Sequence, residues 1–239
     1  MKPPIEILHG SFTRRRYNSI SMFLLALAMF LQGAAAAQSV VLRTFDDDKV
    51  GAPPAGFVMA AGRDAAPEGW TVKREGTARV LVHDGTPSPA DGFAVAIYSG
   101  SQYQDVQVSV RFKTIGGGRT AGLVWKYHDR MNHYSAQLDL VKQELAMYRV
   151  VNGNRIRLER EDDLELDPDA WHSLKIFQKR GEIRVYLGGI RVLTERDRLP
   201  RASASVGLWT GGDATVMFDD FRIEDETEDT PRAGAIKKP

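Results

Sequence analysis

Four polar side chains that can hydrogen-bond to a hydroxyl-rich ligand alternate along two neighbouring segments of the sequence. Lys126 and His128 lie two residues apart in the first segment, and Gln137 and Asp139 lie two apart in the second. Side chains two apart on a β-strand point to the same face of the sheet. If the two segments form a hairpin, the sequence predicts that these four residues face one ligand-binding groove.

An aromatic ring could add a stacking surface to such a groove, and Tyr134, Tyr148 and Trp209 are the candidates to supply one. Tryptophan and tyrosine combine a large apolar surface with one polar edge, which suits a ligand platform and a protein core equally well. Packing in the core is therefore the alternative interpretation for Trp125, Trp171 and Trp209.

Hydrolysis of a glycoside needs two carboxyl groups about 5–10 Å apart. No run of acids alternates along a predicted strand, although a pair from two strands, such as Asp139 with Glu144, stays open. A Gly-x-Ser-x-Gly motif is missing from the sequence, which argues against a serine hydrolase. The sequence also has no cysteine, which excludes a thiol nucleophile and disulfide bonds. Whether the protein is an enzyme is left undecided by these residues.

The strands that must position these side chains are best recognised at Val106, Val108, Val110 and Phe112. These apolar residues alternate with polar ones, which predicts a strand with one buried and one solvent-facing side. Arg111 lies on the polar side and is a further candidate for ligand binding.

The stretch 171–192 predicts a hairpin, because Ile183, Val185 and Leu187 alternate after a turn at Lys179-Arg180-Gly181. The same pattern recurs along the chain, with turn signals such as Asn152-Gly153 between the segments. About twelve short strands and no helical period predict an all-β, two-sheet antiparallel jelly-roll sandwich over residues 38–223.

Residues 1–37 have the pattern of a cleaved signal peptide. Arg14-Arg15-Arg16 is followed by the apolar run Ile20–Leu31 and by Ala35-Ala36-Ala37, which predicts cleavage after Ala37 and a periplasmic or secreted protein. The apolar run is shorter than the roughly 20 residues that a membrane-spanning helix needs, so we expect no stable anchor. The polar residues 224–239 predict a disordered tail.

Removing this signal peptide changes the charge of the protein. It takes four of 32 basic and one of 31 acidic residues, which leaves 28 basic and 30 acidic side chains and a net charge of −2. The sequence therefore provides no excess of positive charge for binding nucleic acid.

Several short motifs occur in a fixed order along the chain. They are Ala121-Gly-Leu-Val-Trp125, Asn132-His-Tyr134, Tyr148-Arg-Val-Val-Asn152-Gly153, Trp171-His-Ser-Leu-Lys175, Ile183-Arg-Val-Tyr186, Val206-Gly-Leu-Trp209 and Phe218-Asp-Asp-Phe221. This order resembles the concanavalin A-like lectin/glucanase superfamily, and within it the chain is most similar to bacterial laminin-G-like and 3-keto-disaccharide-hydrolase-like domains, over roughly Phe45–Ile223. The resemblance implies carbohydrate as the first class of ligand, although one fold hosts many functions.

The resemblance also implies a structural calcium ion. In that superfamily, an aspartate beside the last strand often binds calcium together with the N-terminal strand, and Asp219 matches this position. We therefore expect Asp219 and the Phe45-Asp46 backbone to hold the ion, with a hydrogen-bonded aspartate as the alternative. A melting temperature that calcium leaves unchanged would contradict the expectation.

The sequence thus favours an exported carbohydrate-binding or glycan-associated β-sandwich whose ligand is a glycan or small sugar. A periplasmic glycosidase-like hydrolase acting on sugars or keto-sugars is the alternative, and a structural or protein-binding module is the third. A sheet face with paired carboxylates would favour the enzyme, and an aromatic groove would favour binding. The sequence gives no indication of the oligomeric state.

Overall fold

A computed structural model describes residues 39–61, 68–86, 92–196, 202–211 and 213–226. The chain divides into two compact units, Met1–Ala37 and Gln38–Pro239, and all described residues belong to the second. The predicted signal peptide and most of the predicted tail therefore lie outside the described residues. Among the described residues, no helix is long and apolar enough to span a membrane.

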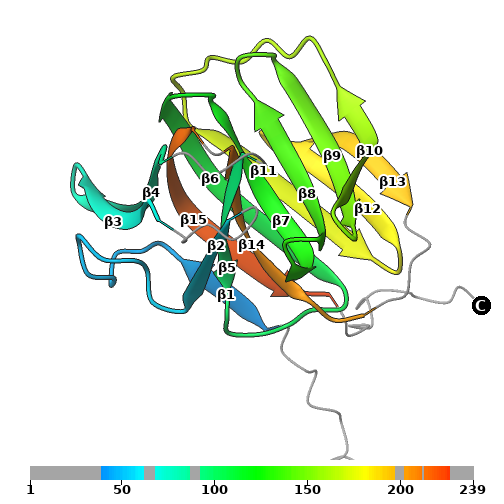
Figure 1. The fold of residues 1–239 in the computed structure, drawn as a ribbon, viewed down its shortest axis with the longest axis horizontal. Helices are drawn as coiled ribbons and strands as arrows, with labels where there is room; N and C mark the ends of the chain where they lie inside the picture. Colours follow the sequence, from blue (N-terminus) through cyan, green and yellow to red (C-terminus); the bar gives the residue numbers. More distant parts are fainter. Residues whose placement is uncertain (1–38, 62–67, 87–91, 197–201, 212, 227–239) are drawn as a thin grey trace, which may run out of the picture. The chain divides into compact units, whose positions relative to one another are not determined.

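Fifteen strands in the described residues form two antiparallel sheets (Figure 1). The eight-stranded sheet has the order β13-β12-β11-β6-β15-β4-β3, and β1 also pairs with β15. Its strands are β1 (Val40–Arg43), β3 (Trp70–Glu75), β4 (Ala78–Asp84), β6 (Val106–Gly116), β11 (His172–Lys179), β12 (Glu182–Leu187), β13 (Ile190–Arg196) and β15 (Thr215–Asp225).

The seven-stranded sheet has the order β10-β9-β8-β7-β14-β5-β2. Its strands are β2 (Phe57–Ala61), β5 (Phe93–Tyr98), β7 (Thr120–Asp129), β8 (Asn132–Asp139), β9 (Glu144–Val151), β10 (Asn154–Glu161) and β14 (Ser205–Gly211). The prediction of an all-β two-sheet antiparallel sandwich is confirmed.

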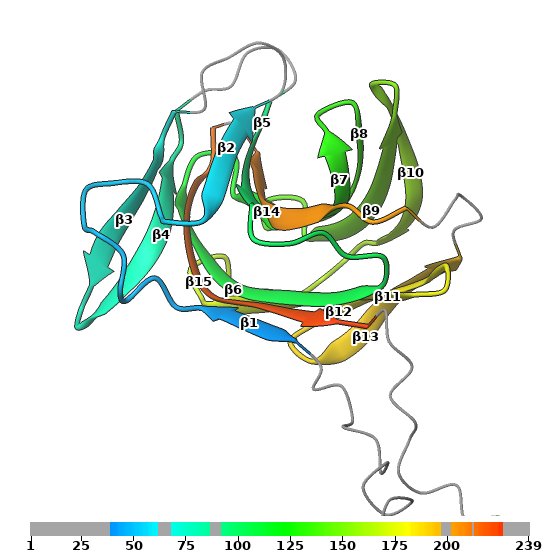
Figure 2. The same cartoon turned by 90° about the horizontal axis from the view of Figure 1, so that it is seen from below.

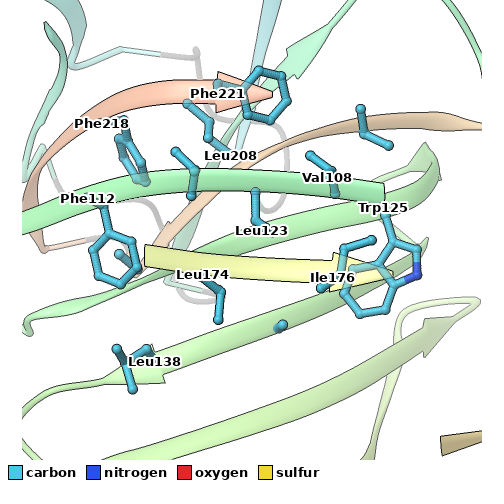
Figure 3. Close-up of a cluster of buried hydrophobic side chains, with 14 of the residues drawn as sticks. Val108, Phe112, Leu123, Trp125, Leu138, Leu174, Ile176, Leu208, Phe218 and Phe221 are labelled. Carbon is cyan, nitrogen blue, oxygen red and sulfur yellow. The ribbon is translucent and has the colours of Figure 1, made fainter. Parts of the chain in front are cut away.

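Alternating side chains of both sheets fill the space between them. On β6 the predicted apolar positions Val106, Val108, Val110 and Phe112 are all buried, while Arg111 is exposed. Figure 3 shows Val108 and Phe112 among core residues of the opposite sheet, such as Leu123 on β7, Leu138 on β8 and Leu208 on β14. Each large apolar side chain buried in this way contributes about 1.5–3 kcal/mol to the stability.

Tight turns set the register of the hairpins. Arg180 and Gly181 both have positive φ, 51° and 82°, and so do Asn152 and Gly153, with 51° and 79°. Two consecutive residues of this kind form the two-residue turn whose twist matches that of the flanking strands. Both turns lie where the sequence predicts them.

The structure differs from the prediction at three places. Strand β2 was not predicted, because its sequence Phe-Val-Met-Ala-Ala does not alternate between apolar and polar residues. The last residues of the predicted hairpin 171–192 begin a separate strand, β13. Strand β15 continues to Asp225, past the predicted boundary at Ile223, because Glu224 pairs with Val40 and Gln107.

The seven-stranded sheet is bent, so that β2 and β10 rise on either side of β14 (Figure 2). Its inner face packs on the core, and its outer face lies on the hollow side of the bend. Val95, Ile97, Val124 and Trp209 form a second buried cluster on that outer face, separate from the main core. A sheet face that buries apolar side chains away from the core marks this side of the protein as a place to look for a site.

Candidate functional site

Polar residues follow β8 along the outer face of the seven-stranded sheet. His133, Ser135 and Gln137 lie at alternating positions, whereas Ala136 and Leu138 between them belong to the main core. All three polar residues are buried. A strand that places polar side chains on a buried outer face departs from ordinary patterning, because buried polar groups are costly unless they are hydrogen-bonded.

Side chains of β9 and β10 contact these polar groups. The Arg155 Nη2 donates a hydrogen bond of 2.7 Å to Gln137 Oε1, and Gln137 Nε2 donates one of 2.9 Å to Ser135 Oγ. The Arg155 guanidinium carbon also lies 3.6 Å from the centre of the Tyr148 ring. Tyr148 is opposite Ser135 in the register of β8 and β9. We call these four residues the Arg155 cluster.

Exposure divides the Arg155 cluster into a support and a contact surface. Ser135 and Gln137 are buried, Tyr148 is half-buried and Arg155 is exposed. Because both ends of the Gln137 amide are hydrogen-bonded, the amide fixes the guanidinium that rests on the tyrosine ring. The cluster therefore presents a positioned cation and an aromatic ring at the surface, which is an arrangement suited to binding.

Three aromatic residues, Phe93, Tyr127 and Trp209, continue this face toward β5 and β14; we call them the aromatic group. His133 contacts two of them, with ring centres 5.7 Å from Phe93 and 5.8 Å from Tyr127. Phe93 stacks on Trp209 with the planes 20° apart. His133 thus connects the aromatic group to the polar residues of β8.

Gly122 allows the strands to lie close together at the centre of this face. It is opposite Trp209 on β14 and Gln137 on β8. A Cβ atom at this position would lie 1.9 Å from the carbonyl oxygen of Ala136, so any side chain would push β7 and β8 apart. The absence of a side chain keeps the aromatic group and the Arg155 cluster on one continuous surface.

His133 is a neutral base under physiological conditions. Burial lowers the pKa of His133, and the Arg155 charge also lowers it, although Asp129 raises it. The Nδ1 atom lies 3.3 Å from the Asp129 backbone carbonyl oxygen, which can only accept a hydrogen bond. Nδ1 therefore carries the proton, and Nε2 is the basic nitrogen. Burial likewise raises the pKa of Tyr127, which keeps its hydroxyl protonated.

The sequence-predicted ligand-binding residues separate into two groups. Gln137 and Tyr148 lie together in the Arg155 cluster. Tyr134 instead packs in the core against Trp125, with ring centres 5.7 Å apart, so it offers no platform on the outer face. Lys126 is buried with φ 45° in an irregular part of β7, and His128 is exposed two residues later. This irregularity disrupts the alternation from which a common face for Lys126 and His128 was predicted.

Asp139 and Glu144 lie directly opposite each other where β8 turns into β9. Asp139 Oδ1 accepts hydrogen bonds from the backbone N–H groups of Val141 and Lys142, and its Oδ2 is 3.0 Å from Lys142 Nζ. Glu144 Oε2 is 3.4 Å from Arg160 Nη1. Asp139 therefore closes the turn, and each of the two carboxylates already has a cationic partner.

Arg111 and Asp219 lie on the other sheet. The Arg111 guanidinium lies 5.0 Å from the Trp171 ring centre and 2.9 Å from Asp220, so Arg111 is remote from the Arg155 cluster. Trp171 packs there against a small cluster on the outer face of the eight-stranded sheet. The alternative that this tryptophan packs is thus realised, although outside the main core.

The surroundings of Asp219 contain two further aspartates and backbone N–H donors. Burial raises the pKa of Asp219, and the charges of Asp220 and Asp46 also raise it. However, Asp219 Oδ1 accepts the Asp220 N–H at 2.8 Å, and Asp46 Oδ1 accepts the Arg79 N–H at 2.9 Å. No group of three or more His, Asp or Glu side chains suited to a metal occurs in the described part of the chain. The calcium site stays a prediction.

Sequence reasoning missed His133, Ser135, Arg155 and Phe93. Arg155 follows the Asn152-Gly153 turn, so the predicted hairpin already places it beside β9. His133 and Ser135 share the parity of Gln137, which was the available signal. That signal becomes evident only when β8 is known to bury both of its faces.

Comparison with known proteins assigns the chain to a family. Residues 59–224, more than half of the sequence, match the model of the 3-keto-alpha-glucoside-1,2-lyase-like domain. A comparison with curated proteins finds no match.

Solved structures with the same fold include proteins that act on carbohydrates. The chain is similar to the carbohydrate-binding module CBM66 of Bacillus subtilis, with 19% identity, a TM-score of 0.54, and coverage of 66% of this chain and 96% of the module. It is also similar to domain 4 of the extracellular arabinanase AbnA of Geobacillus stearothermophilus, solved with arabinotriose, with 13% identity, a TM-score of 0.55, and coverage of 79% and 93%.

A lichenase from a mouse hindgut metagenome gives a TM-score of 0.53 at 10% identity, with coverage of 78% of this chain and 99% of the enzyme. At such low identities these likenesses establish the fold alone. Together with the family match they confirm the resemblance to the concanavalin A-like superfamily.

Proposed function

The chain belongs to the 3-keto-alpha-glucoside-1,2-lyase-like family, and on this premise we propose that it binds a glucose-type saccharide on the outer face of its seven-stranded sheet. One observation carries the proposal. The exposed Arg155 guanidinium is held by Gln137 over the Tyr148 ring, and the aromatic group lies on the same sheet face.

The chemistry of this face suits a sugar. A guanidinium supplies several N–H donors in a fixed plane, which pair with hydroxyl or carbonyl oxygens. The exposed edges of Tyr148 and Phe93 supply apolar contact for the C–H groups of a pyranose ring. Polar groups on a rigid support beside an aromatic surface are the usual composition of a small-ligand site.

The family suggests which saccharide to test first. A 3-keto-glucoside differs from a glucoside by a carbonyl group in place of one hydroxyl, and a carbonyl oxygen accepts hydrogen bonds without donating any. Arg155 donates without accepting, so it is matched to that oxygen. We expect a 3-keto-glucoside to bind more tightly than the corresponding glucoside.

Isothermal titration of the chain with the two sugars tests this proposal. The expected result is saturable binding of both, with the 3-keto-glucoside as the tighter ligand. A hexose without affinity for the fold, chosen from a glycan panel, provides the baseline. Heats for both glucosides that equal this baseline would contradict the proposal.

A lyase activity is a second candidate function, favoured by the neutral imidazole of His133. The hydrogen on C2 of a 3-keto-glucoside is acidic because it is next to the ketone. In the proposed step, His133 Nε2 takes this proton and the electron pair moves toward the ketone as an enolate. The C1–O bond then breaks, a C1=C2 double bond forms, and the departing oxygen takes a proton from the imidazolium or from water.

The pH dependence of this step follows from the lowered pKa of His133. Turnover, measured by the ultraviolet absorbance of the conjugated product, is expected to be constant above pH 6.5, the ordinary histidine value, and to fall only at lower pH. Replacing the base by His133→Gln is expected to cost roughly 100-fold or more in turnover while saccharide binding remains. His172→Gln, on the other sheet, is the control.

The same shift predicts the pH dependence of stability. The folded chain holds His133 and His83 neutral, because burial lowers the pKa of both. Below pH 6.5 the unfolded chain therefore binds more protons, so the melting temperature is expected to decrease as the pH falls through this value.

Turnover of His133→Gln equal to that of the unchanged chain would contradict the catalytic role.

Export is also part of the proposal, supported by the basic, apolar and small-residue segments of residues 1–37. Expression in a bacterium with an intact export system should yield a protein that begins at Gln38. N-terminal sequencing measures this directly. Recovery of all the protein with Met1 intact in the cytoplasm would contradict export.

A further inference from the structure

A groove of 610 Å³ lies beside the end strands of the two sheets. It runs between the start of β13, the end strand of one sheet, and segment 161–166, which follows β10 at the end of the other. Leu164, Leu166 and Val192 line its floor and pack on the main core. No residue of the Arg155 cluster or the aromatic group lines the groove, so this surface is separate from the proposed saccharide site.

One glutamine side chain fixes the wall of the groove. Gln143 Oε1 accepts the Leu166 N–H at 2.8 Å, and Gln143 Nε2 donates to the Leu166 carbonyl at 3.1 Å. The backbone carbonyl of Gln143 accepts the Leu164 N–H at 3.0 Å. Because three hydrogen bonds hold segment 161–166 in place, the groove is already formed in the single chain.

Ile190 extends the apolar surface of the groove onto its rim. Its side chain is 72% exposed, the largest exposed fraction among the large apolar residues that the structure describes. Ile190 follows the Gly188-Gly189 turn between β12 and β13, and a Cβ atom at either glycine would meet nothing within 4 Å, so the turn projects from the sheet. Single apolar residues are ordinary on a protein surface, but one that continues an apolar groove forms a patch suited to association.

The next residue on this rim, Arg191, forms no ion pair within the part of the chain that the structure describes. It lies opposite Tyr186 in the register of β12 and β13. Lys175 lies opposite Tyr186 on the other side, with its Nζ 4.4 Å from the centre of the ring. Tyr186 is thus flanked by two cations, and an acid from another molecule would reduce their repulsion.

The other wall of the groove bears an acid in the same situation. Glu161 is exposed at the end of β10, and it too forms no ion pair within the described ranges. The neighbouring cation, Arg160, pairs with Glu144 and Asp162 instead, at 3.4 and 2.9 Å. The groove therefore combines an apolar floor with an acid on one wall and a cation on the other.

These features make the surface complementary to a second copy of itself. Ile190 and Arg191 are consecutive, so one copy presents an apolar side chain followed by a cation. The groove of another copy offers an apolar floor and the acid Glu161, which match these two residues in kind. A two-fold axis makes the contact occur twice, because the same patch is then used by both copies.

We propose that two copies of the chain associate around a two-fold axis at this groove. Ile190 of each copy lies in the groove of the other, and Arg191 of each copy pairs with Glu161 of the other. None of these three residues belongs to the Arg155 cluster or to the aromatic group, so the association does not depend on the proposed function.

Sedimentation velocity of the full chain over a wide range of concentrations tests the proposal, and a monomer–dimer equilibrium is expected. Ile190→Asp is expected to raise the dissociation constant roughly 100-fold or more, because the lost apolar contact occurs twice in a two-fold dimer. Val58→Asp is the matched control. Val58 is 59% exposed and lies on β2, at the opposite end of the seven-stranded sheet from β10, so the equilibrium is expected to stay unchanged.

Exchanging the two charges makes the test specific to the proposed pairing. Arg191→Glu and Glu161→Arg are each expected to raise the dissociation constant roughly tenfold or more, because like charges then meet. The two substitutions combined in one chain are expected to restore the dimer. An equal mixture of the two single variants is expected to form a heterodimer, because one chain then has acids at both positions and the other has arginines at both.

The melting temperature of each variant shows whether it is folded, and these exposed positions are expected to tolerate the changes. A chain that stays monomeric at every concentration would overturn the proposal. Self-association that Ile190→Asp leaves unchanged would also overturn it, and so would single charge variants that fail to associate when mixed. Saccharide titration is an independent readout, because its failure contradicts the proposed function and leaves the dimer intact.

Discussion

Replacing Arg155 by methionine is expected to weaken saccharide binding roughly 10- to 100-fold, because a hydrogen bond to a charged group contributes about 1.5–3 kcal/mol and each 1.4 kcal/mol is tenfold in affinity. Methionine keeps much of the aliphatic stem but loses all the N–H donors. The Tyr148 ring also loses the cation that lies 3.6 Å from its centre. Isothermal titration measures the effect.

Arg184→Met is the matched control for this substitution. Arg184 also lies over an aromatic ring, that of Phe177, and also pairs with a polar side chain, Glu182, but on the opposite sheet. Its replacement is expected to leave saccharide affinity unchanged. If Arg155→Met and Arg184→Met reduce affinity equally, Arg155 has no direct role in the site.

Gln137 supports Arg155, so its substitution gives a related prediction for saccharide affinity. Gln137→Leu keeps a side chain of similar size but removes the acceptor of the Arg155 hydrogen bond. Because the two residues act through one contact, the double variant is expected to lose little more affinity than Arg155→Met alone. Additive losses would indicate that Gln137 contacts the ligand independently.

Replacing Phe218 by alanine is expected to remove about 3–5 kcal/mol from the free energy of unfolding, as large-to-small substitutions in a core usually do. Phe218 is fully buried. Its ring centre lies 5.7 Å from that of Trp70, on which it stacks, and 6.3 Å from that of Phe112. The two sheets cannot collapse around the space that its ring leaves without moving β4 or β6. Urea denaturation measures the loss.

Phe177→Ala is the control for the core substitution. The Phe177 ring is half-buried on the outer face of β11, so its removal opens no internal cavity. We expect a loss of stability well below that of Phe218→Ala. Equal losses would show that the packing between the sheets is not the main source of stability.

Much of the fold was predictable because it depends on local patterns. The alternation at Val106–Phe112 and the turns at Arg180-Gly181 and Asn152-Gly153 determine strand faces and hairpin register within a few residues. Strand β2 was not predictable in this way, because its small and apolar residues fit a strand only when β5 pairs with it.

The candidate site was predictable only in part, because it depends on which strand has both of its faces buried. Gln137 was identified from its alternation with Asp139, and Tyr148 from its aromatic character. Tyr134 is also aromatic, but it lies one residue before Ser135 on β8, so its side chain points to the opposite face and packs in the core. Lys126 was placed by a strict alternation that the irregularity in β7 breaks. A single irregular residue reverses such a prediction for every residue that follows it.

Hydrogen exchange with and without a saturating 3-keto-glucoside tests the location of the saccharide site most directly. The account predicts that the sugar slows exchange at the backbone amides of β8, β9 and β10, which carry the Arg155 cluster, and leaves β11, β12 and β13 unchanged. Slower exchange in β11–β13 alone, or no change anywhere under saturating sugar, would contradict it.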